Sequence, residues 1–194
     1  MKPTLIVMVK EPRPGRVKTR LGREIGMIEA AWWYRHHMSR LLSHVKDPRW
    51  RSVAAFAPDR ARTLPGEVRD HWPQGRGDLG RRMMRMLRRA GSPSLLIGSD
   101  IHGLTHVHIT RAWRTLGKND AVIGPSPDGG FWLLGLKHPR RHPVNCLDGA
   151  RWSSPYALMD TVKRLGGRTA LTDMLQDIDT VEDLAMTRTK ARDT

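Results

Sequence analysis

A run of basic residues follows the first apolar stretch of the chain. Residues 10–21 read KEPRPGRVKTRL, and the side chains there that could hold an anion are Lys10, Arg13, Arg16, Lys18 and Arg20. Arginine offers a fork of donors and lysine a point charge, so both favour a polyanionic ligand held beside backbone N–H groups. Gly15 lets the backbone approach such a ligand closely. The segment predicts a phosphate cradle, with an exposed basic loop as the alternative, and it lacks the glycine spacing of a Walker P-loop.

Asp100 follows the short apolar run at residues 94–98. If that run is a strand of an open α/β sheet, its carboxyl end lies at the crevice where ligands collect. Mg²⁺ and Mn²⁺ need hard oxygen ligands, usually one or two carboxylates together with phosphate oxygens. The alternative is that Asp100 caps the helix that follows. Position alone leaves both interpretations open.

Asp128 lies in the turn-rich segment GPSPDGGF at residues 124–131, between two apolar runs. An Asp-Gly pair is a strong hairpin signal, and composition alone favours a turn. The two glycines before Phe131 would also let a sugar or a base lie close to the backbone, with Asp128 as an acceptor for a hydroxyl proton.

Further carboxylates occur in the segment DIDTVED at residues 177–183. Thr180 and Asp183 fit a variant of the capping box at the start of a last helix. Capping does not account for Asp177 and Asp179, and one of them is a candidate for a second carboxylate that faces a metal.

Other reactive residue types show no catalytic or metal-binding pattern. The histidines lack the spacing of metalloproteases and zinc fingers, and the single Cys146 permits no internal disulfide. The arginines within residues 81–89 recur at helical spacing and predict a solvated helix face. Trp32, Trp33 and Trp113 are expected to pack in the core or in grooves rather than to serve as stacking platforms.

Alternating strand and helix patterns must position these residues. The expected strands are residues 5–9, 52–57, 94–98, 121–124, 131–136 and 168–171, and the expected helices are residues 24–45, 78–90 with Asp78 as the cap, 105–116, 154–165 and 181–188. Such alternation predicts one α/β domain over residues 1–194: a three-layer sandwich whose mostly parallel sheet has helices on both faces, with a basic tail after about residue 190. Loops 10–20, 58–62, 99–104 and 125–130 would then share one rim.

Composition sets weaker bounds on function. The chain has 194 residues, 39% of them hydrophobic, and a formal net charge of +15. That charge raises nucleic acid as a partner, but the arginines are scattered through helices and loops, so the evidence for it is weak. No apolar run approaches the length of a membrane span, and the N-terminal residues do not resemble a secretory signal, so we expect a cytoplasmic protein without a membrane span.

Six segments occur in an order that resembles a known family. They are residues 10–21 (KEPRPGRVKTRL), 74–83 (QGRGDLGRRM), 97–100 (IGSD), 124–131 (GPSPDGGF), 152–154 (WSS) and 177–184 (DIDTVEDL). Together they resemble a bacterial family of glycosyltransferase-like proteins with the nucleotide-diphospho-sugar transferase fold, often called GT-A. The arrangement is also similar to phospholactate guanylyltransferase and, more distantly, to the guanylyltransferase that matures molybdenum cofactor.

This resemblance implies metal-assisted transfer of a sugar from a nucleotide-diphosphate donor to a small-molecule acceptor, with Mg²⁺ or Mn²⁺ as the cofactor. The basic loop would hold the diphosphate, and Asp100 would stand for the metal-binding carboxylate of the DxD-like site. Gln74 and Asp78 would lie near the nucleotide, Asp128 near the acceptor or sugar, and Asp179 near the metal.

The chain departs from the family pattern at two positions. His102 replaces the usual proline two residues after the strand-end aspartate, and Phe131 replaces the usual tyrosine, which removes a hydroxyl from the ligand side. Two other functions stay open from sequence. One is nucleotidyl transfer of the guanylyltransferase kind to a phosphorylated small molecule, and the other is a basic nucleic-acid-binding module, which the scattered arginines make the weaker interpretation.

Overall fold

The computed structural model describes residues 2–61, 66, 68–178, 180 and 183 of the chain. Its strands are β1 (Thr4–Lys10), β2 (Arg51–Ala57), β3 (Asp70–Pro73), β4 (Ser94–Ile97), β5 (Ala121–Pro125), β6 (Phe131–Leu136) and β7 (Thr169–Leu171). Its helices are α1 (Thr19–Ile25), α2 (Met27–His44), α3 (Leu79–Ala90), α4 (His106–Lys118), the short 3₁₀ helix η1 (Pro139–Arg141) and α5 (Ala157–Leu165).

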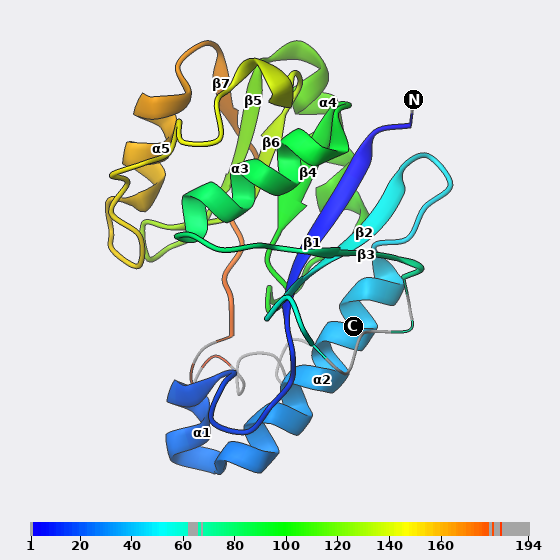
Figure 1. Ribbon diagram of the computed structural model, residues 1–194, viewed down its shortest axis with the longest axis vertical. Coiled ribbons are helices and arrows are strands. Elements are labelled where there is room, and N and C mark those ends of the chain that lie inside the picture. Colours follow the sequence, from blue (N-terminus) through cyan, green and yellow to red (C-terminus); the bar gives the residue numbers. More distant parts are fainter. Residues whose placement is uncertain (1, 62–65, 67, 179, 181–182, 184–194) are drawn as a thin grey trace.

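Within these residues the strands form a seven-stranded sheet in the order β3-β2-β1-β4-β6-β5-β7 (Figure 1). Strand β6 runs antiparallel to its neighbours β4 and β5, and the other pairs are parallel. The expected mostly parallel sheet is confirmed. Because β1, β4 and β5 run in the same direction, their carboxyl ends meet at one edge of the sheet.

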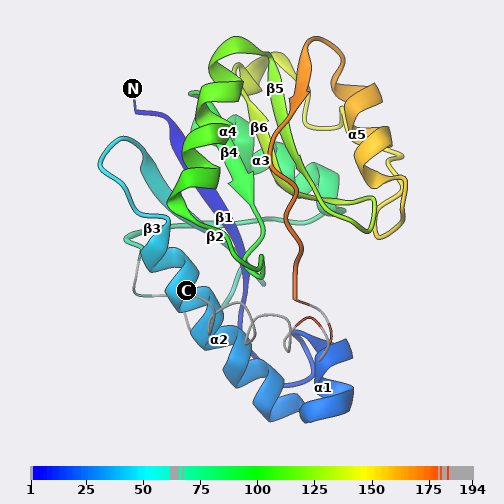
Figure 2. The same cartoon turned by 180° about the vertical axis from the view of Figure 1, so that it is seen from behind.

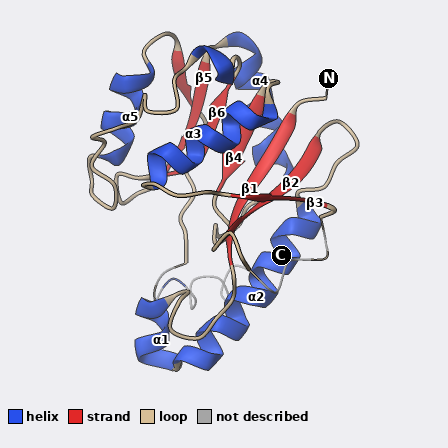
Figure 3. Ribbon diagram, in the orientation of Figure 1, coloured by secondary structure: helices blue, strands red, loops and turns tan. Residues whose placement is uncertain are grey.

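Helices cover both faces of this sheet, so the molecule has the expected three layers (Figures 2 and 3). The strand β1 shows why, because its successive side chains alternate between two hydrophobic clusters. Leu5 and Val7 pack with residues of α2 and α4, whereas Ile6 packs with residues of α3 and α5. All three side chains are fully buried, as a continuous apolar strand in a covered parallel sheet requires.

Local signals explain where the helices begin and end. Asp78 caps α3, since its side chain accepts a hydrogen bond from the backbone N–H of Arg81 at 2.8 Å, and Gly91 ends that helix with φ +68°. Thr105 and His108 form a capping box at the start of α4. No helix in the described part of the chain combines the length and the apolar character needed to cross a bilayer.

Two expectations, about one helix and one tryptophan, are wrong, and one strand was not expected. Residues 24–45 do not form one helix: α1 begins at Thr19, and Gly26 with φ +100° separates it from α2. Strand β3 was not expected, because its sequence DHWP is short and polar and is held only at the edge of the sheet by β2. Trp32 is 64% exposed rather than packed, whereas Trp33 and Trp113 do pack against the core. The helix expected at residues 181–188 lies outside the described residues except for Asp183.

Candidate functional site

A pocket of about 600 Å³ opens at the carboxyl edge of β1, β4 and β5. This volume is typical of a site for a small molecule or cofactor. Three of the four loops predicted to share this rim line the pocket, whereas the described residues of the fourth, 58–61, do not. The sequence-predicted site residues that line the pocket are Lys10, Lys18, Arg20, Gln74, Asp100 and Asp128.

Lys18 and Asp100 meet directly inside this pocket. The Lys18 Nζ lies 2.5 Å from Oδ2 of Asp100, and the lysine side chain is 5% exposed against 30% for the aspartate. The alternative that Asp100 caps the next helix is wrong, because α4 starts later and has Thr105 as its cap. The expectation that the basic loop and the strand-end aspartate share one crevice is therefore confirmed, although their roles in binding stay predictions.

Tyr34 of α2 holds the two sides of the crevice together, and sequence reasoning missed it. Its hydroxyl accepts a hydrogen bond from the backbone N–H of Lys10 at 3.0 Å and lies 2.7 Å from Oγ of Ser99. The ring is only 3% exposed, and burial raises the pKa of its hydroxyl above the ordinary value. One side chain thus links the end of β1 to the residue beside Asp100.

His37 lies one turn after Tyr34 on the same helix. Its ring stacks on Trp33 with a centroid distance of 5.0 Å. Burial lowers the pKa of the imidazole, while the charge of Asp100 acts in the opposite direction. The α2 face behind the pocket therefore favours a neutral histidine.

The segment at residues 176–178 is attached to the loop that carries Asp100. Ile101 and Asp177 form an isolated antiparallel bridge, with backbone hydrogen bonds from His102 N–H to Gln176 O at 2.7 Å and from Ile178 N–H to Asp100 O at 3.0 Å. Asp177 consequently lines the pocket. His102 stands where the resemblance led us to expect proline, and its N–H makes a bond that a proline could not make.

The expected capping pair near the C-terminal end is confirmed. The backbone N–H of Thr180 donates to Oδ2 of Asp183 at 2.9 Å, and the backbone N–H of Asp183 donates to Oγ1 of Thr180 at 3.3 Å. Asp179, the other candidate metal ligand, lies outside the described residues.

Asp128 belongs to the hairpin turn between β5 and β6 and also lines the pocket. Its Oδ1 accepts a hydrogen bond from Gly130 N–H at 2.9 Å, and Ser126 N–H donates to Gly130 O at 3.0 Å. Gly129 has φ +82°, and a Cβ there would lie 2.3 Å from the carbonyl oxygen of Pro155. The turn expected from composition is confirmed, and it presents the Asp128 carboxylate to the crevice.

Arg13 and Gly15 of the basic loop do not line the pocket. The Arg13 Nε lies 2.8 Å from Oε2 of Glu11, so this guanidinium pairs within its own loop. Gly15 has φ +70°, a conformation that glycine adopts at little cost. The phosphate-binding role assigned to these two residues stays a prediction.

Gln74 lines the pocket but bonds to the sheet. It is 2% exposed, and its amide donates to Val9 O at 3.2 Å and to Ala55 O at 2.8 Å. Its Oε1 accepts a hydrogen bond from Arg82 at 3.0 Å. Gln74 therefore joins β1, β2 and α3. Asp78 caps α3 and does not line the pocket. The contacts of Gln74 and Asp78 with a nucleotide stay predictions.

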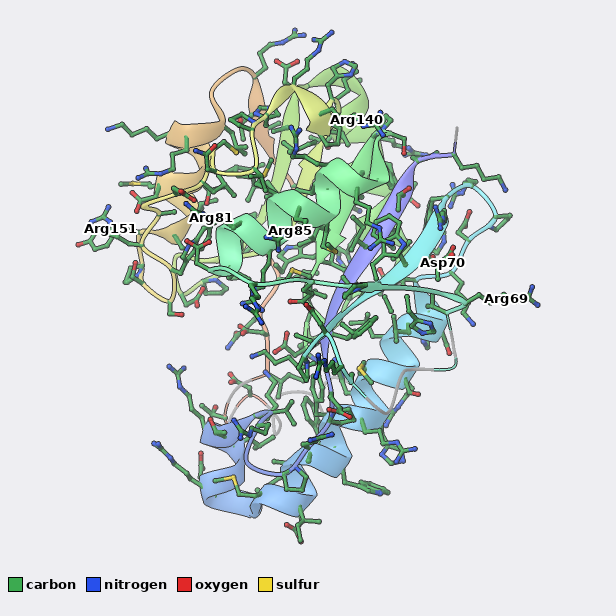
Figure 4. The ribbon with its side chains drawn as sticks, viewed as in Figure 1. Arg69, Asp70, Arg81, Arg85, Arg140 and Arg151 are labelled. Carbon is green, nitrogen blue, oxygen red and sulfur yellow. The ribbon has the colours of Figure 1, made fainter. Side chains whose placement is uncertain are left out.

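The arginines of α3 lie on the exposed or partly exposed side of the helix, as their spacing predicted, and they also make specific contacts. Arg81 pairs with Asp148, and Arg85 donates to Gln74 O at 2.7 Å (Figure 4). Arg89 lies over the ring of Trp72, with its guanidinium carbon 4.7 Å from the ring centroid. Arg82 lines the pocket. The motif QGRGDLGRRM at residues 74–83 contains both Gln74 and Arg82. This motif was the signal in the sequence that could have indicated the contact between them.

The pocket also has an apolar wall. Met8, Phe131 and Trp152 line it and pack against the second hydrophobic cluster, which contains residues of α3 and α5. Phe131 and Trp152 meet edge to face at 6.3 Å, and a Cβ at Gly80 would lie 2.6 Å from Trp152. The sequence motifs at residues 74–83 and 152–154 thus meet at the apolar wall.

The described residues contain no group of three or more His, Cys, Asp or Glu side chains arranged for a metal ion. Asp100 nevertheless offers oxygen ligands toward the pocket and already binds one cation, the ammonium of Lys18. A single carboxylate completed by phosphate oxygens is an ordinary donor set for Mg²⁺. The residues present therefore fit a metal that arrives with a phosphorylated ligand.

Comparison with known protein families identifies the chain. A family described as an uncharacterized protein conserved in bacteria (DUF2064) matches residues 41–154, more than half of the sequence. The chain belongs to the DUF2064 family. No curated protein matches it.

Solved structures show the fold of this DUF2064 protein. A candidate nucleotide-diphospho-sugar transferase from Desulfovibrio desulfuricans G20 matches with a TM-score of 0.83 and 29% identity, over 95% of this chain and 85% of that chain. A CMP:2-keto-3-deoxy-manno-octonic acid synthetase complexed with CTP matches with a TM-score of 0.57 and 8% identity, over the full length of both chains. The Mycobacterium tuberculosis H37Rv protein Rv0371C, in complex with manganese, matches with a TM-score of 0.52 and 12% identity, over 96% of this chain and 97% of that chain.

These structures support the nucleotide-diphospho-sugar transferase-like fold that the six segments predicted. They also support a transferase in general terms. The particular relatives expected from sequence, the phospholactate and molybdenum cofactor guanylyltransferases, are not among these matches, and the donor and acceptor are not fixed by them.

Proposed function

We propose that this DUF2064 protein transfers a sugar from a nucleotide-diphosphate donor to a small-molecule acceptor with the help of a divalent metal. The observation that carries the proposal is the contact of Lys18 with Asp100 inside a pocket that Lys10 and Arg20 also line. Cations for a diphosphate and a carboxylate for a metal are thereby brought within one crevice. The similarity to the D. desulfuricans protein supports the same reaction class.

In this mechanism Lys10, Lys18 and Arg20 bind the diphosphate and stabilise the negative charge that grows on it as the sugar leaves. Asp100 would hold Mg²⁺ or Mn²⁺, which when bound neutralises the leaving group as a Lewis acid. The Rv0371C complex shows manganese in a protein of this fold, which supports the choice of ion. Asp179 remains our proposal for a second ligand.

Asp128 is our candidate for the base that accepts the proton of the acceptor hydroxyl. Its carboxylate lines the pocket beside the apolar wall of Phe131 and Trp152. Asp59, a second candidate base, lies in the loop after β2. It accepts a hydrogen bond from Gly75 N–H at 2.8 Å and is not among the residues that line the pocket. The geometry therefore favours Asp128 over Asp59.

Calorimetry with UDP and GDP, with and without Mg²⁺ or Mn²⁺, tests the proposal. We expect metal-dependent nucleotide binding that Asp100→Ala removes. The matched control is Asp70→Ala, because Asp70 pairs with Arg51 on the far strands of the sheet. Absence of metal-dependent binding in the unsubstituted chain would remove the mechanism.

Nucleotidyl transfer uses the same cradle and metal, and the fold is shared with a synthetase complexed with CTP. Product analysis separates the two reactions, because glycosyl transfer releases a nucleoside diphosphate and nucleotidyl transfer releases pyrophosphate. Nucleic-acid binding is the weaker alternative, since Arg69 and Arg151 project from opposite sides of the molecule in the view of Figure 4. RNA affinity that falls steeply with salt, without nucleotide affinity, would favour it.

A further inference from the structure

The carboxylate of Asp100 binds a cation that the chain itself supplies. The Lys18 ammonium lies 2.5 Å from Oδ2 of Asp100, and the lysine side chain is almost fully buried at 5% exposure. Lys10 and Arg20, which line the same pocket, are exposed residues. Lys18 is therefore the pocket cation that is buried against the carboxylate.

This contact places two proposed tasks in conflict. The ammonium of Lys18 is expected to bind the diphosphate, and Asp100 is expected to bind the metal, yet each is occupied by the other. An ammonium and a divalent ion at the same carboxylate oxygen repel each other strongly in a partly buried site, where the screening by water is reduced. A metal at that oxygen requires Lys18 to move away.

We propose that Lys18 is an internal competitor of the divalent metal at Asp100, and that the incoming diphosphate releases the carboxylate by drawing Lys18 to itself. This inference rests on the proposed function. It makes metal and nucleotide a cooperative pair: the free protein binds metal weakly, and each ligand strengthens the other. Binding free energies are linked, so the factor is the same in both directions.

The competition also gives the site an order of assembly. A metal ion without a nucleotide must displace the buried Lys18 ammonium from Asp100 without supplying a new anion for it. A nucleotide offers that ammonium a second anion, so the diphosphate and the metal together satisfy both charges. Premature occupation of Asp100 by a free metal ion is thereby disfavoured.

Titration of the full chain with Mn²⁺ in the absence of nucleotide, followed by electron paramagnetic resonance of the free ion, tests the competition. We expect Lys18→Met to bind Mn²⁺ on the order of tenfold more tightly than the unsubstituted chain, within the usual range of coupling between sites. The matched control is Lys10→Met, which removes the same charge from the same pocket and is expected to change the affinity less than about twofold. Asp100→Asn should abolish the gain.

Equal Mn²⁺ affinities for Lys18→Met and Lys10→Met would overturn the proposal. Circular dichroism confirms that each variant folds; if Lys18→Met does not, Lys18→Gln is judged by the same criterion. This arm contains no nucleotide, so it decides the competition at Asp100 independently of the proposed function.

A second arm measures GDP binding in EDTA. Asp100→Asn frees Lys18 for the diphosphate, so its gain in GDP affinity should be larger in the chain that keeps Lys18 than in one that also carries Lys18→Met. Equal gains would show only relief of repulsion and would contradict the transfer of Lys18 to phosphate. Failure of GDP and UDP to bind any variant would instead remove the proposed function.

Discussion

Removal of the Tyr34 hydroxyl should destabilise the protein and loosen the crevice. The hydroxyl accepts from Lys10 N–H at 3.0 Å and lies 2.7 Å from Ser99 Oγ, in a site where the ring is 3% exposed. Tyr34→Phe keeps the ring and removes the hydroxyl, so Lys10 N–H and Ser99 Oγ each lose this hydrogen-bond partner. At about 1 kcal/mol for each of two hydrogen bonds, the loss is about 2 kcal/mol in the free energy of unfolding. For a chain of this size that is a fall of about 4–8 °C in Tm.

Urea and thermal unfolding followed by circular dichroism measure this change. The matched control is Tyr156→Phe, because Tyr156 is 48% exposed and its change is expected to stay within about 0.5 kcal/mol. Ser99→Ala leaves the bond from Lys10 in place and should cost less than Tyr34→Phe. A loss below about 0.5 kcal/mol for Tyr34→Phe would refute the role of Tyr34 in joining β1 to β4.

The same variant carries a signature in alkaline solution. Burial raises the pKa of Tyr34 above its ordinary value of 10.0, because the charged form is poorly solvated. Tyr34 therefore contributes stability that is fully present below pH 10.0, the pKa of an unfolded tyrosine, and that is lost as pH rises through the higher folded pKa. Tyr34→Phe should lack this alkaline loss, and an unchanged pH profile would contradict the assignment.

Three further predictions concern the surroundings of the site. Asp78→Ala removes the cap of α3 and should cost about 1 kcal/mol in thermal unfolding, and an unchanged Tm would contradict the cap. Gly129→Ala should lower the free energy of unfolding by at least about 3 kcal/mol, because φ is +82° and the new Cβ would lie 2.3 Å from Pro155 O. The control is Gly117→Ala in α4, which has open space around the new Cβ and should be neutral or stabilising. Similar losses for the two variants would contradict the close approach at Gly129. Hydrogen bonds from Arg49 lower the pKa of Asp47 from 3.8 to about 2, so the stability that this pair contributes is lost as pH falls through this interval. Asp47→Asn should therefore flatten the dependence of the urea-derived free energy of unfolding on pH in that interval. An unaltered dependence on pH would count against the Asp47–Arg49 pair.

The contact of Lys18 with Asp100 could be anticipated because it depends on strand direction. Parallel strands bring the loops after β1 and β4 to the same edge, and β1 and β4 pair in parallel from Thr4 with Ser94 to Val7 with Ile97. The apolar runs and turn signals were sufficient to assign those strands. The hairpin at Asp128 followed from local turn chemistry in the same way.

Residues that act through tertiary contacts could not be found by the same rules. Tyr34 occupies an ordinary apolar position of α2, and its hydroxyl partners come from the end of β1 and from the loop after β4. The α3 arginines have the spacing of a solvated face, yet Arg82 and Arg85 bond to Gln74 because β3 brings that residue alongside. The strand β3 itself is too short and polar to be recognised without β2 as its partner.

Elements whose positions follow from backbone direction carry Lys18, Asp100 and Asp128, the groups proposed to face the diphosphate, the metal and the acceptor. The buried hydrogen bonds of Tyr34 and Gln74 hold those elements together. Substitution of Tyr34 or Gln74 should therefore affect stability and ligand affinity together, whereas a charge change at Lys18 should separate metal affinity from nucleotide affinity.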